Sequence, residues 1–273
     1  MRIGISHVPR HDSPAEWAAA LSALGCRAAV FPCNHRESDA KIDAYVAAAK
    51  DHDLLIAEVG AWCNPLHADP AERAKNLRYC QDQLALAEHV GARCCVNIAG
   101  TTGEIWDGGY VENYGPEALQ RVVETTRVII DAVRPTRSCY ALEPMPWMIP
   151  SSPAEYSDLM QAVDRQAFAV HLDVVNMINC PQRYFFNRDF LDECFRVLGP
   201  HIRSCHVKDV RLERHLTFNL KEVAAGDGAL DLRHYAELAH ACDQDMPFII
   251  EHLSSADEYH RVLKTVQALT NLL

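Results

Sequence analysis

Short apolar runs alternate with longer helical patterns along the whole chain, and this alternation restricts the fold more than any other feature. Several of the runs are apolar on both faces, as parallel strands covered by helices should be. Eight runs can be counted: RIGISHV from Arg2, RAAVFPC from Arg27, LLIAEVGAW from Leu54, ARCCVNIAG from Ala92, SCYALEPM from Ser138, AFAVHLDVV from Ala167, IRSCHVKDV from Ile202 and PFIIEHL from Pro247. Repeated strand-helix units of this kind predict a parallel sheet.

Helix start and stop signals lie between these runs. A capping or turn residue precedes proline, which suits the first turn of a helix, at Ser13-Pro14, Asp69-Pro70, Gly115-Pro116 and Ser152-Pro153. Glycines stand where helices should stop, at Gly25, Gly91 and Gly199. Eight strands, each followed by a helix, with a last helix over 256–273, predict a (β/α)8 TIM barrel without an exposed sheet edge. A doubly wound open sheet is the weaker alternative.

Length and charge restrict the organisation and the partners. The 273 residues suit a single barrel domain over 1–273, with no linker or internal repeat. A net charge of −11 without a basic patch opposes binding to nucleic acid or to anionic lipid. No apolar run reaches the roughly 20 residues of a membrane span, and the first residues lack the core of a signal peptide. We therefore expect a cytoplasmic protein, and self-association into a homo-oligomer is left open.

The cysteines predict reduced thiols. Their number, eleven, is odd, they lie mostly in apolar runs, and no CxxC pair exists.

Long connections follow several strands, at 100–115, 176–188 and 211–230, whereas the turns from helix to next strand are short. In a barrel, long loops after strands build the active-site face.

Four consecutive strands each carry an ionisable residue near the carboxyl end of an apolar run. These residues are Glu143 in ALEPM, Asp173 in VHLDVV, His206 in SCHVKD and Glu251 in FIIEHL. In a barrel their side chains would converge, and a cation would stabilise that arrangement. An oxygen-rich set without thiolate suits Mn²⁺ first and Mg²⁺ second, with Co²⁺ and Zn²⁺ also compatible. The alternative, four unrelated buried polar residues with local hydrogen bonds, does not explain their equivalent positions.

These residues make the chain resemble the xylose isomerase-like TIM barrels, which include sugar epimerases and isomerases, inosose dehydratases and apurinic-site endonucleases. Members of that family bind a divalent cation through Glu, Asp, His and Glu from strands five to eight, and Glu143, Asp173, His206 and Glu251 match these positions. The segment 226–231, GDGALD, also resembles the family's Gly-x-Gly-x-x-Asp turn before helix seven. A glycine-rich turn with an Asp helix cap has a purely structural explanation as well.

The resemblance to ketose 3-epimerases implies that Glu143 and Glu251 are the acid and the base, on opposite sides of the substrate. A metal that chelates carbonyl and hydroxyl oxygens stabilises the enediolate formed when the neighbouring proton is removed. The leading hypothesis is therefore an isomerase or epimerase of a sugar or sugar derivative that transfers a proton through a metal-bound enediolate. Two positions depart from that branch, which often has His where Asn176 stands and an acidic residue where Ile149 stands.

Other activities remain as alternatives. A dehydratase or other lyase would use the same metal and base to expel a β-leaving group from a keto-sugar or keto-inositol. An endonuclease is more remote, because that branch uses three metals with additional His ligands, and Asn97 stands where a strand-four His would be needed. The acidic charge balance also argues against it. A non-catalytic sugar-binding protein is equally remote.

Further residues are candidates for catalysis or substrate binding. Lys208 lies two residues after His206 and therefore shares its inward face, as an acid, a base or an oxyanion clamp, or as the partner of a ligand or of Asp209 in a salt bridge. The candidates for substrate binding are His7, Trp62, Asn97, Trp147, His171 and Asn176. For the histidines and Asn97, the competing interpretation is a core polar group with its hydrogen bonds satisfied. For the tryptophans, it is ordinary packing.

Overall fold

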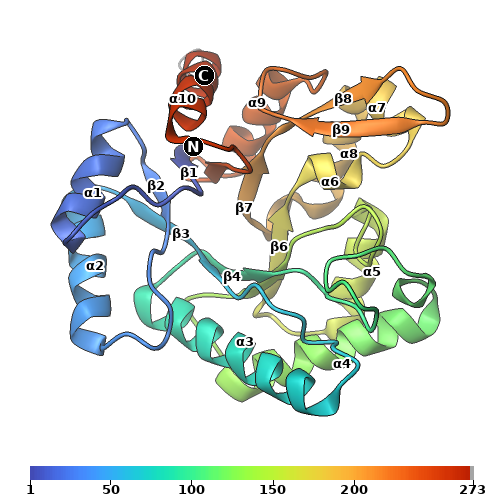
Figure 1. Cartoon of the computed structure of the whole chain (residues 1–273), viewed down its shortest axis with the longest axis horizontal. Helices are drawn as coiled ribbons and strands as arrows, with labels where there is room; N and C mark the ends of the chain where they lie inside the picture. The colour runs from blue at the N-terminus through green and yellow to red at the C-terminus, as the bar shows by residue number, and fades with distance from the viewer. Residues whose placement is uncertain (271–273) are drawn as a thin grey trace.

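The computed structural model describes residues 1–270 and has the barrel architecture that the sequence predicts (Figure 1). Its eight parallel strands pair in the order β1-β10-β7-β6-β5-β4-β3-β2. They are β1 (Arg2–Ile5), β2 (Ala28–Val30), β3 (Leu55–Gly60), β4 (Cys94–Asn97), β5 (Tyr140–Leu142), β6 (Phe168–Leu172), β7 (Ile202–Val207) and β10 (Pro247–Ile250). Each lies in one of the eight predicted runs. The strands follow one another around the sheet in chain order, which excludes a doubly wound sheet.

The barrel closes where β1 meets β2, and a glycine lies at this point. The Arg27 amide donates to the Ile3 carbonyl at 2.8 Å between the two strands. A Cβ at Gly4 would overlap the carbonyl oxygen of Ala28. Because glycine has no Cβ, it lets the two backbones approach closely enough to bring the ends of the sheet together.

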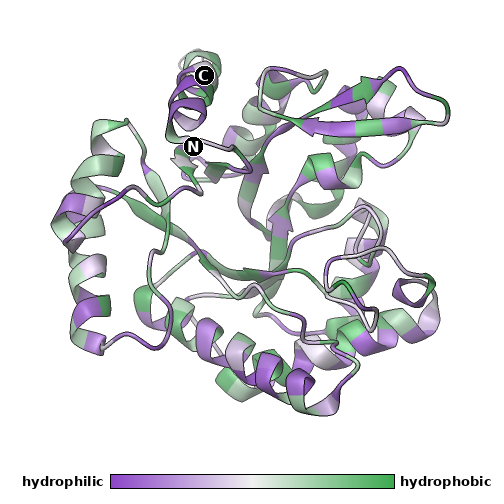
Figure 2. Ribbon diagram, in the orientation of Figure 1, coloured by the Kyte–Doolittle hydropathy of each residue, from purple (hydrophilic) through white to green (hydrophobic). Residues whose placement is uncertain are grey.

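Helices cover the outside of the strands, and Figure 2 shows apolar residues along the strands and polar residues on the outer helix faces. They are α1 (Pro14–Ala23), α2 (Asp39–Asp51), α3 (Pro70–Val90), α4 (Pro116–Val133), α5 (Pro153–Val163), α8 (Asn187–Leu198), α9 (Leu232–Cys242) and α10 (Ala256–Thr270). The four proline start signals are confirmed, and in three the capping side chain accepts a first-turn amide: Ser13, Asp69 and Ser152. Gly91 ends α3 in the left-handed conformation, at φ 69°. The predicted end of the last helix, 271–273, lies outside the described residues.

The long connections after strands contain elements that the sequence analysis did not predict. An antiparallel hairpin, β8 (Asp209–Glu213) and β9 (Asn219–Val223), follows β7 and lies beside α7 (Pro181–Phe185) in Figure 1. A short helix, α6 (Val174–Met177), follows β6, and a 3₁₀ helix, η1 (Val111–Asn113), follows β4. Another 3₁₀ helix, η2 (Gly199–His201), lies in the short turn between α8 and β7.

The glycine-rich turn at 226–228 has a structural role in this fold. The buried carboxylate of Asp209 accepts the amides of Gly226 at 3.1 Å and of Gly228 at 3.0 Å. A Cβ at Gly228 would overlap that carboxylate. Asp231 then caps α9 by accepting the His234 amide at 3.0 Å. The turn therefore wraps around Asp209, which explains its glycines without a ligand.

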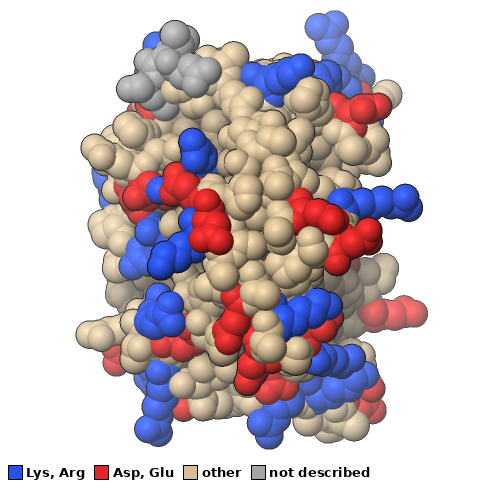
Figure 3. Space-filling model, turned by 90° about the vertical axis from the view of Figure 1, so that its left-hand side faces the viewer, with Lys and Arg blue, Asp and Glu red and all other residues tan. Residues whose placement is uncertain are grey.

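The thiols match the sequence analysis, and one face of the surface shows how the charges are distributed. All eleven cysteines are free, and most are buried. Figure 3, which turns the side of α1 and α2 towards the viewer, shows acidic and basic side chains interspersed on that face. No helix in the described part of the chain has the length and apolar character needed to cross a membrane.

Candidate metal centre

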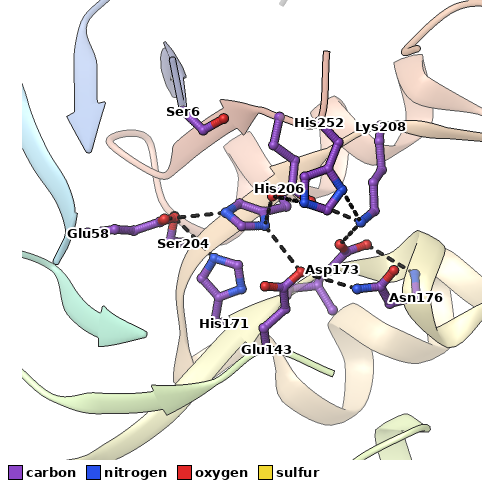
Figure 4. Close-up of polar contacts among 12 residues, drawn as sticks. Ser6, Glu58, Glu143, His171, Asp173, Asn176, Ser204, His206, Lys208 and His252 are labelled. Atoms are coloured by element: carbon purple, nitrogen blue, oxygen red, sulfur yellow. Dashed lines mark hydrogen bonds and ion pairs between the residues drawn. The ribbon is translucent and has the colours of Figure 1, made fainter. Parts of the chain in front are cut away.

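The four predicted ligands converge at the carboxyl ends of the strands. Figure 4 shows three of them, Glu143, Asp173 and His206, beside one another. Glu143 follows β5, Asp173 follows β6, His206 lies near the end of β7, and Glu251 follows β10. Each residue offers one ligand atom within 4.8 Å of the ligand atoms of the other three. All four side chains are buried. Equivalent positions on consecutive strands thus become one compact group of three carboxylates and one imidazole.

His206 lies at the centre of this group. Its Nδ1 is 2.8 Å from the Glu251 carboxylate and 3.4 Å from that of Glu143. The side-chain amide of Asn176 donates to the same Glu143 oxygen at 3.1 Å. The Asn176 backbone amide donates to Asp173 Oδ1, also at 3.1 Å, so that Asp173 caps α6. Asn176, a predicted substrate-binding residue, therefore orients two of the candidate ligands.

Lys208 points into the same group, as its spacing from His206 predicted. Its Nζ is 2.7 Å from Asp173, 2.9 Å from Glu251 and 3.1 Å from Glu222 on the hairpin. The side chain is only 2% exposed. Its salt bridges go to two candidate ligands and not to Asp209, whose oxygens accept backbone amides. The ammonium therefore lies where it could act on a substrate held at the ligands.

The charges of the group shift its pKa values in opposite directions. Burial alone would lower the pKa of His206, but the carboxylates, that of Glu251 first, raise it well above the ordinary value. Burial raises the pKa of Asp173 to about 7, against the attraction of Lys208. Burial acts in the same sense on Glu251, but His206 and Lys208 hold its pKa well below the ordinary value. Two cationic side chains thus balance the buried carboxylates.

These residues fit a divalent metal ion. Asp173 Oδ2 is buried beside the Lys208 ammonium, yet it accepts no well-directed hydrogen bond. This oxygen could also accept a metal ion, because its partner is an ammonium without directed hydrogen-bond geometry and a buried carboxylate is stabilised by a cation. Three carboxylates and an imidazole, without thiolate, form a ligand set suited to Mn²⁺ or Mg²⁺. Glu143, Asp173, His206 and Glu251 would hold the ion.

A second buried group lies beside the ligands, and the sequence analysis missed its central residue, which comes from the opposite wall of the barrel. Glu58 on β3 accepts hydrogen bonds from His171 Nε2 at 3.0 Å, from His206 Nε2 at 3.3 Å and from the Ser204 hydroxyl. Burial acts to raise the pKa of Glu58, but the two imidazoles lower it far below the ordinary value. The available signal was an acidic residue inside the apolar run LIAEVG. It lies within the strand, whereas the four candidate ligands lie at or just after the ends of their strands.

The remaining predicted substrate-binding residues lie in different surroundings. His171 is fully buried in the group around Glu58. Asn97 exchanges two hydrogen bonds with the Cys63 backbone, at 3.1 and 3.3 Å, which matches the interpretation as a satisfied core polar group. Three others lie on loops after β1, β3 and β5: His7, Trp62 and Trp147. The tryptophans are 44% and 42% exposed, and the imidazole of His7 stacks on a tyrosine ring.

Two polar residues at the mouth of the site were also missed. His252 Nδ1 is 2.9 Å from Glu222, and both side chains lie near the Lys208 ammonium. Nothing in the sequence marks Glu222, because its place depends on how the β8-β9 hairpin folds over the barrel end. His252 directly follows Glu251, so the sequence already indicated that it lies near the site.

Comparisons with known proteins agree with this fold. The family model described as Xylose isomerase-like TIM barrel matches residues 18–271. No curated protein matches the sequence. Among solved structures, a probable 3-DHS dehydratase from Bacillus anthracis has a TM-score of 0.75 at 15% identity, with 99% of each chain covered. Endonuclease IV from Thermus thermophilus has a TM-score of 0.74 at 17% identity, with 100% of each covered. The 3-keto-D-glucoside 4-epimerase from E. coli has a TM-score of 0.71 at 15% identity, with 99% of each covered. Identities this low show a shared fold.

Proposed function

Because this chain belongs to the xylose isomerase-like TIM barrel family, we propose that it is a metal-dependent enzyme that isomerises or epimerises a sugar or sugar derivative. The observation that carries the proposal is the convergence of Glu143, Asp173, His206 and Glu251 at the carboxyl ends of the strands. Active sites of barrel enzymes lie at this end. Mn²⁺ is the first candidate ion, Mg²⁺ the second, and Co²⁺ or Zn²⁺ would also be compatible.

Glu143 and Glu251 are the proposed proton-transfer pair. When bound, a divalent ion would stabilise negative charge on the substrate's oxygens and so make the proton beside a carbonyl easier to remove. The chain's own residues hold the two carboxylates in place: His206 contacts both, Asn176 donates to Glu143, and Lys208 pairs with Glu251. Fixed carboxylates avoid the cost of reorganisation during proton transfer.

Exposed aromatic side chains support a carbohydrate substrate. Trp62 and Trp147 follow β3 and β5 at the carboxyl ends of the strands and are roughly half exposed. Such rings can stack on the apolar face of a sugar. The net charge of −11 disfavours a polyanionic substrate such as nucleic acid. We therefore propose a small carbohydrate as the substrate.

A dehydratase or other lyase is the second candidate, and the position of Lys208 favours it. Its buried ammonium lies between Asp173 and Glu251, where it could protonate a leaving hydroxyl group. The same metal and base would serve both reactions. An endonuclease is disfavoured by the acidic charge and by Asn97, whose amide is occupied by the Cys63 backbone.

The experiment is a substrate screen with solvent exchange. Protein stripped with a chelator and reloaded with Mn²⁺ is incubated in D2O with ketoses, keto-inositols and 3-keto sugars. An epimerase or isomerase should produce a stereoisomer or an isomer, seen by NMR, and deuterium at the carbon beside the carbonyl where the proton exchanges with solvent. A dehydratase should instead yield an unsaturated product that absorbs in the ultraviolet. Turnover that survives metal removal would contradict the proposed metal centre.

A further inference from the structure

We infer that Glu58 is a positioning residue of the metal centre, whose carboxylate sets the orientation and tautomer of His206. This inference rests on the proposed metal centre. The imidazole of His206 uses its two nitrogens in opposite directions, with Nδ1 facing Glu143 and Glu251 and Nε2 facing Glu58 (Figure 4). Only Nδ1 can therefore bind an ion held by the carboxylates.

The tautomer decides whether Nδ1 can bind. A neutral imidazole carries one proton, and the nitrogen without it supplies the lone pair to a metal. Near Glu143 and Glu251, the proton would be attracted to Nδ1, which would block the ligand atom. A carboxylate that accepts from Nε2 attracts the proton to the other side of the ring. Glu58, at 3.3 Å from Nε2, is the acceptor that does so.

Glu58 is itself held in place by several contacts. The Ser204 hydroxyl and His171 Nε2 both donate to Oε1, which leaves Oε2 for His206. All four side chains are at most 3% exposed. The His171 ring also meets the His206 ring edge-on, with centroids 4.1 Å apart and planes at 82°. Hydrogen bonds and packing thus restrict both the carboxylate and the imidazole.

The position of β3 makes this contact possible. In the sheet order, three strands separate β3 from β7 in either direction, so the two strands lie on opposite walls of the barrel. The Glu58 carboxylate reaches Ser204 and His206 across the interior. If Glu58 served stability alone, an apolar residue of similar volume could replace it without loss of stability. An apolar residue could not orient the His206 ring.

The group Glu58, His171 and His206 could also be considered as a second ion site, because its ligand atoms lie close together. This group has a single carboxylate, which accepts hydrogen bonds from the two imidazoles at 3.0 and 3.3 Å, whereas the metal centre offers three carboxylates to an ion. The Ser204 hydroxyl donates to the same carboxylate, which an added ion would have to displace. The geometry therefore assigns Glu58 to orientation, with one ion per chain.

The test compares Mn²⁺ affinity in Glu58→Gln and in the matched control Glu88→Gln. Glu88 accepts the backbone amides of Arg137 and Ser138, just before β5 begins and therefore at the opposite end of the barrel. Calorimetric titration of the purified full-length proteins should show one ion per chain in each. Affinity should fall about 10- to 100-fold in Glu58→Gln and stay unchanged in the control.

A spectroscopic measurement separates orientation from general destabilisation. Long-range ¹H-¹⁵N NMR of the Zn²⁺-loaded wild type should show His206 bound through Nδ1 and protonated at Nε2. The Glu58→Gln protein should lose this single pattern. If Glu58→Gln fails to fold, Ser204→Ala removes one donor to Glu58 and should weaken Mn²⁺ binding in the same direction, by a smaller factor.

The outcomes distinguish the two proposals. Wild-type metal binding with unchanged affinity and tautomer in Glu58→Gln, or in Ser204→Ala where that variant replaces it, overturns the role of Glu58 and leaves the metal centre intact. Two ions per chain, one of them lost in Glu58→Gln, would make Glu58 a ligand and also overturn the inference. Absence of metal binding by the wild type would overturn both the metal centre and the inference.

Discussion

Replacement of Lys208 by methionine tests both the electrostatics and the chemistry of the site. Methionine keeps most of the length of the side chain and removes its charge. In the wild type the ammonium lies within 3.1 Å of Asp173, Glu251 and Glu222 and is 2% exposed. Without it, His206 is the main cation facing the buried carboxylates. We therefore expect the metal-free variant to be strongly destabilised.

The size of the effect follows from the burial of the pair. Removing one partner of a buried ion pair costs about 3–5 kcal/mol. For a chain of this size, each kcal/mol shifts the melting temperature by roughly 2–4 °C, so the metal-free variant should melt about 6–20 °C below the wild type. A bound divalent ion would replace the lost positive charge beside the same carboxylates and so stabilise the folded variant. The difference between variant and wild type should therefore shrink when both are saturated with Mn²⁺.

The assay is thermal unfolding with chelator and with Mn²⁺, followed by turnover of the folded, loaded protein. If the ammonium acts on the substrate, kcat of Lys208→Met should fall at least ~100-fold, about 3 kcal/mol of lost transition-state stabilisation. Lys75→Met is the control, because the exposed pair of Lys75 with Glu72 at 3.1 Å should be worth less than about 1 kcal/mol.

Two results would refute parts of this reasoning. Early melting with normal turnover of the folded Lys208→Met protein would make Lys208 a structural salt-bridge partner alone. Normal melting and normal turnover would show that the ammonium does not balance the carboxylates at all.

Three further predictions concern the ligands and the fold. Glu143→Gln and Glu251→Gln should each reduce kcat more than Mn²⁺ affinity, because an amide keeps an oxygen ligand but cannot take a proton; wild-type rates in either variant would remove that residue from proton transfer. Metal binding should release protons and strengthen as the pH rises above 6.5, because the pKa of His206 is raised well above that ordinary value and its ring must lose a proton to bind an ion. Calorimetry in buffers of different ionisation enthalpy measures this release, and a buffer-independent enthalpy would contradict it. Gly228→Ala should lower the melting temperature because its Cβ would overlap a buried carboxylate, whereas the new Cβ of Gly199→Ala has space and should change it little.

Local patterns in the sequence were sufficient for the strands, the helix starts and the candidate ligands. A strand in a parallel barrel is apolar on both faces, so an acidic or imidazole side chain near its carboxyl end is conspicuous, as at Glu143, Asp173, His206 and Glu251. The two-residue period of a strand also predicted that Lys208 shares the inward face of His206. These features depend on neighbours along the chain, which the sequence states directly.

Contacts between distant segments were decided by the tertiary structure. Glu58 meets His206 because barrel closure places β3 opposite β7, 148 residues away along the chain. Glu222 reaches Lys208 because the hairpin folds over the barrel end. Asn97 had the pattern of a cavity residue, but the loop after β3 supplies Cys63 as its partner. Burial and hydrogen-bond partners are properties of the packed chain, whereas periodicity along one strand specifies only the face on which a side chain lies.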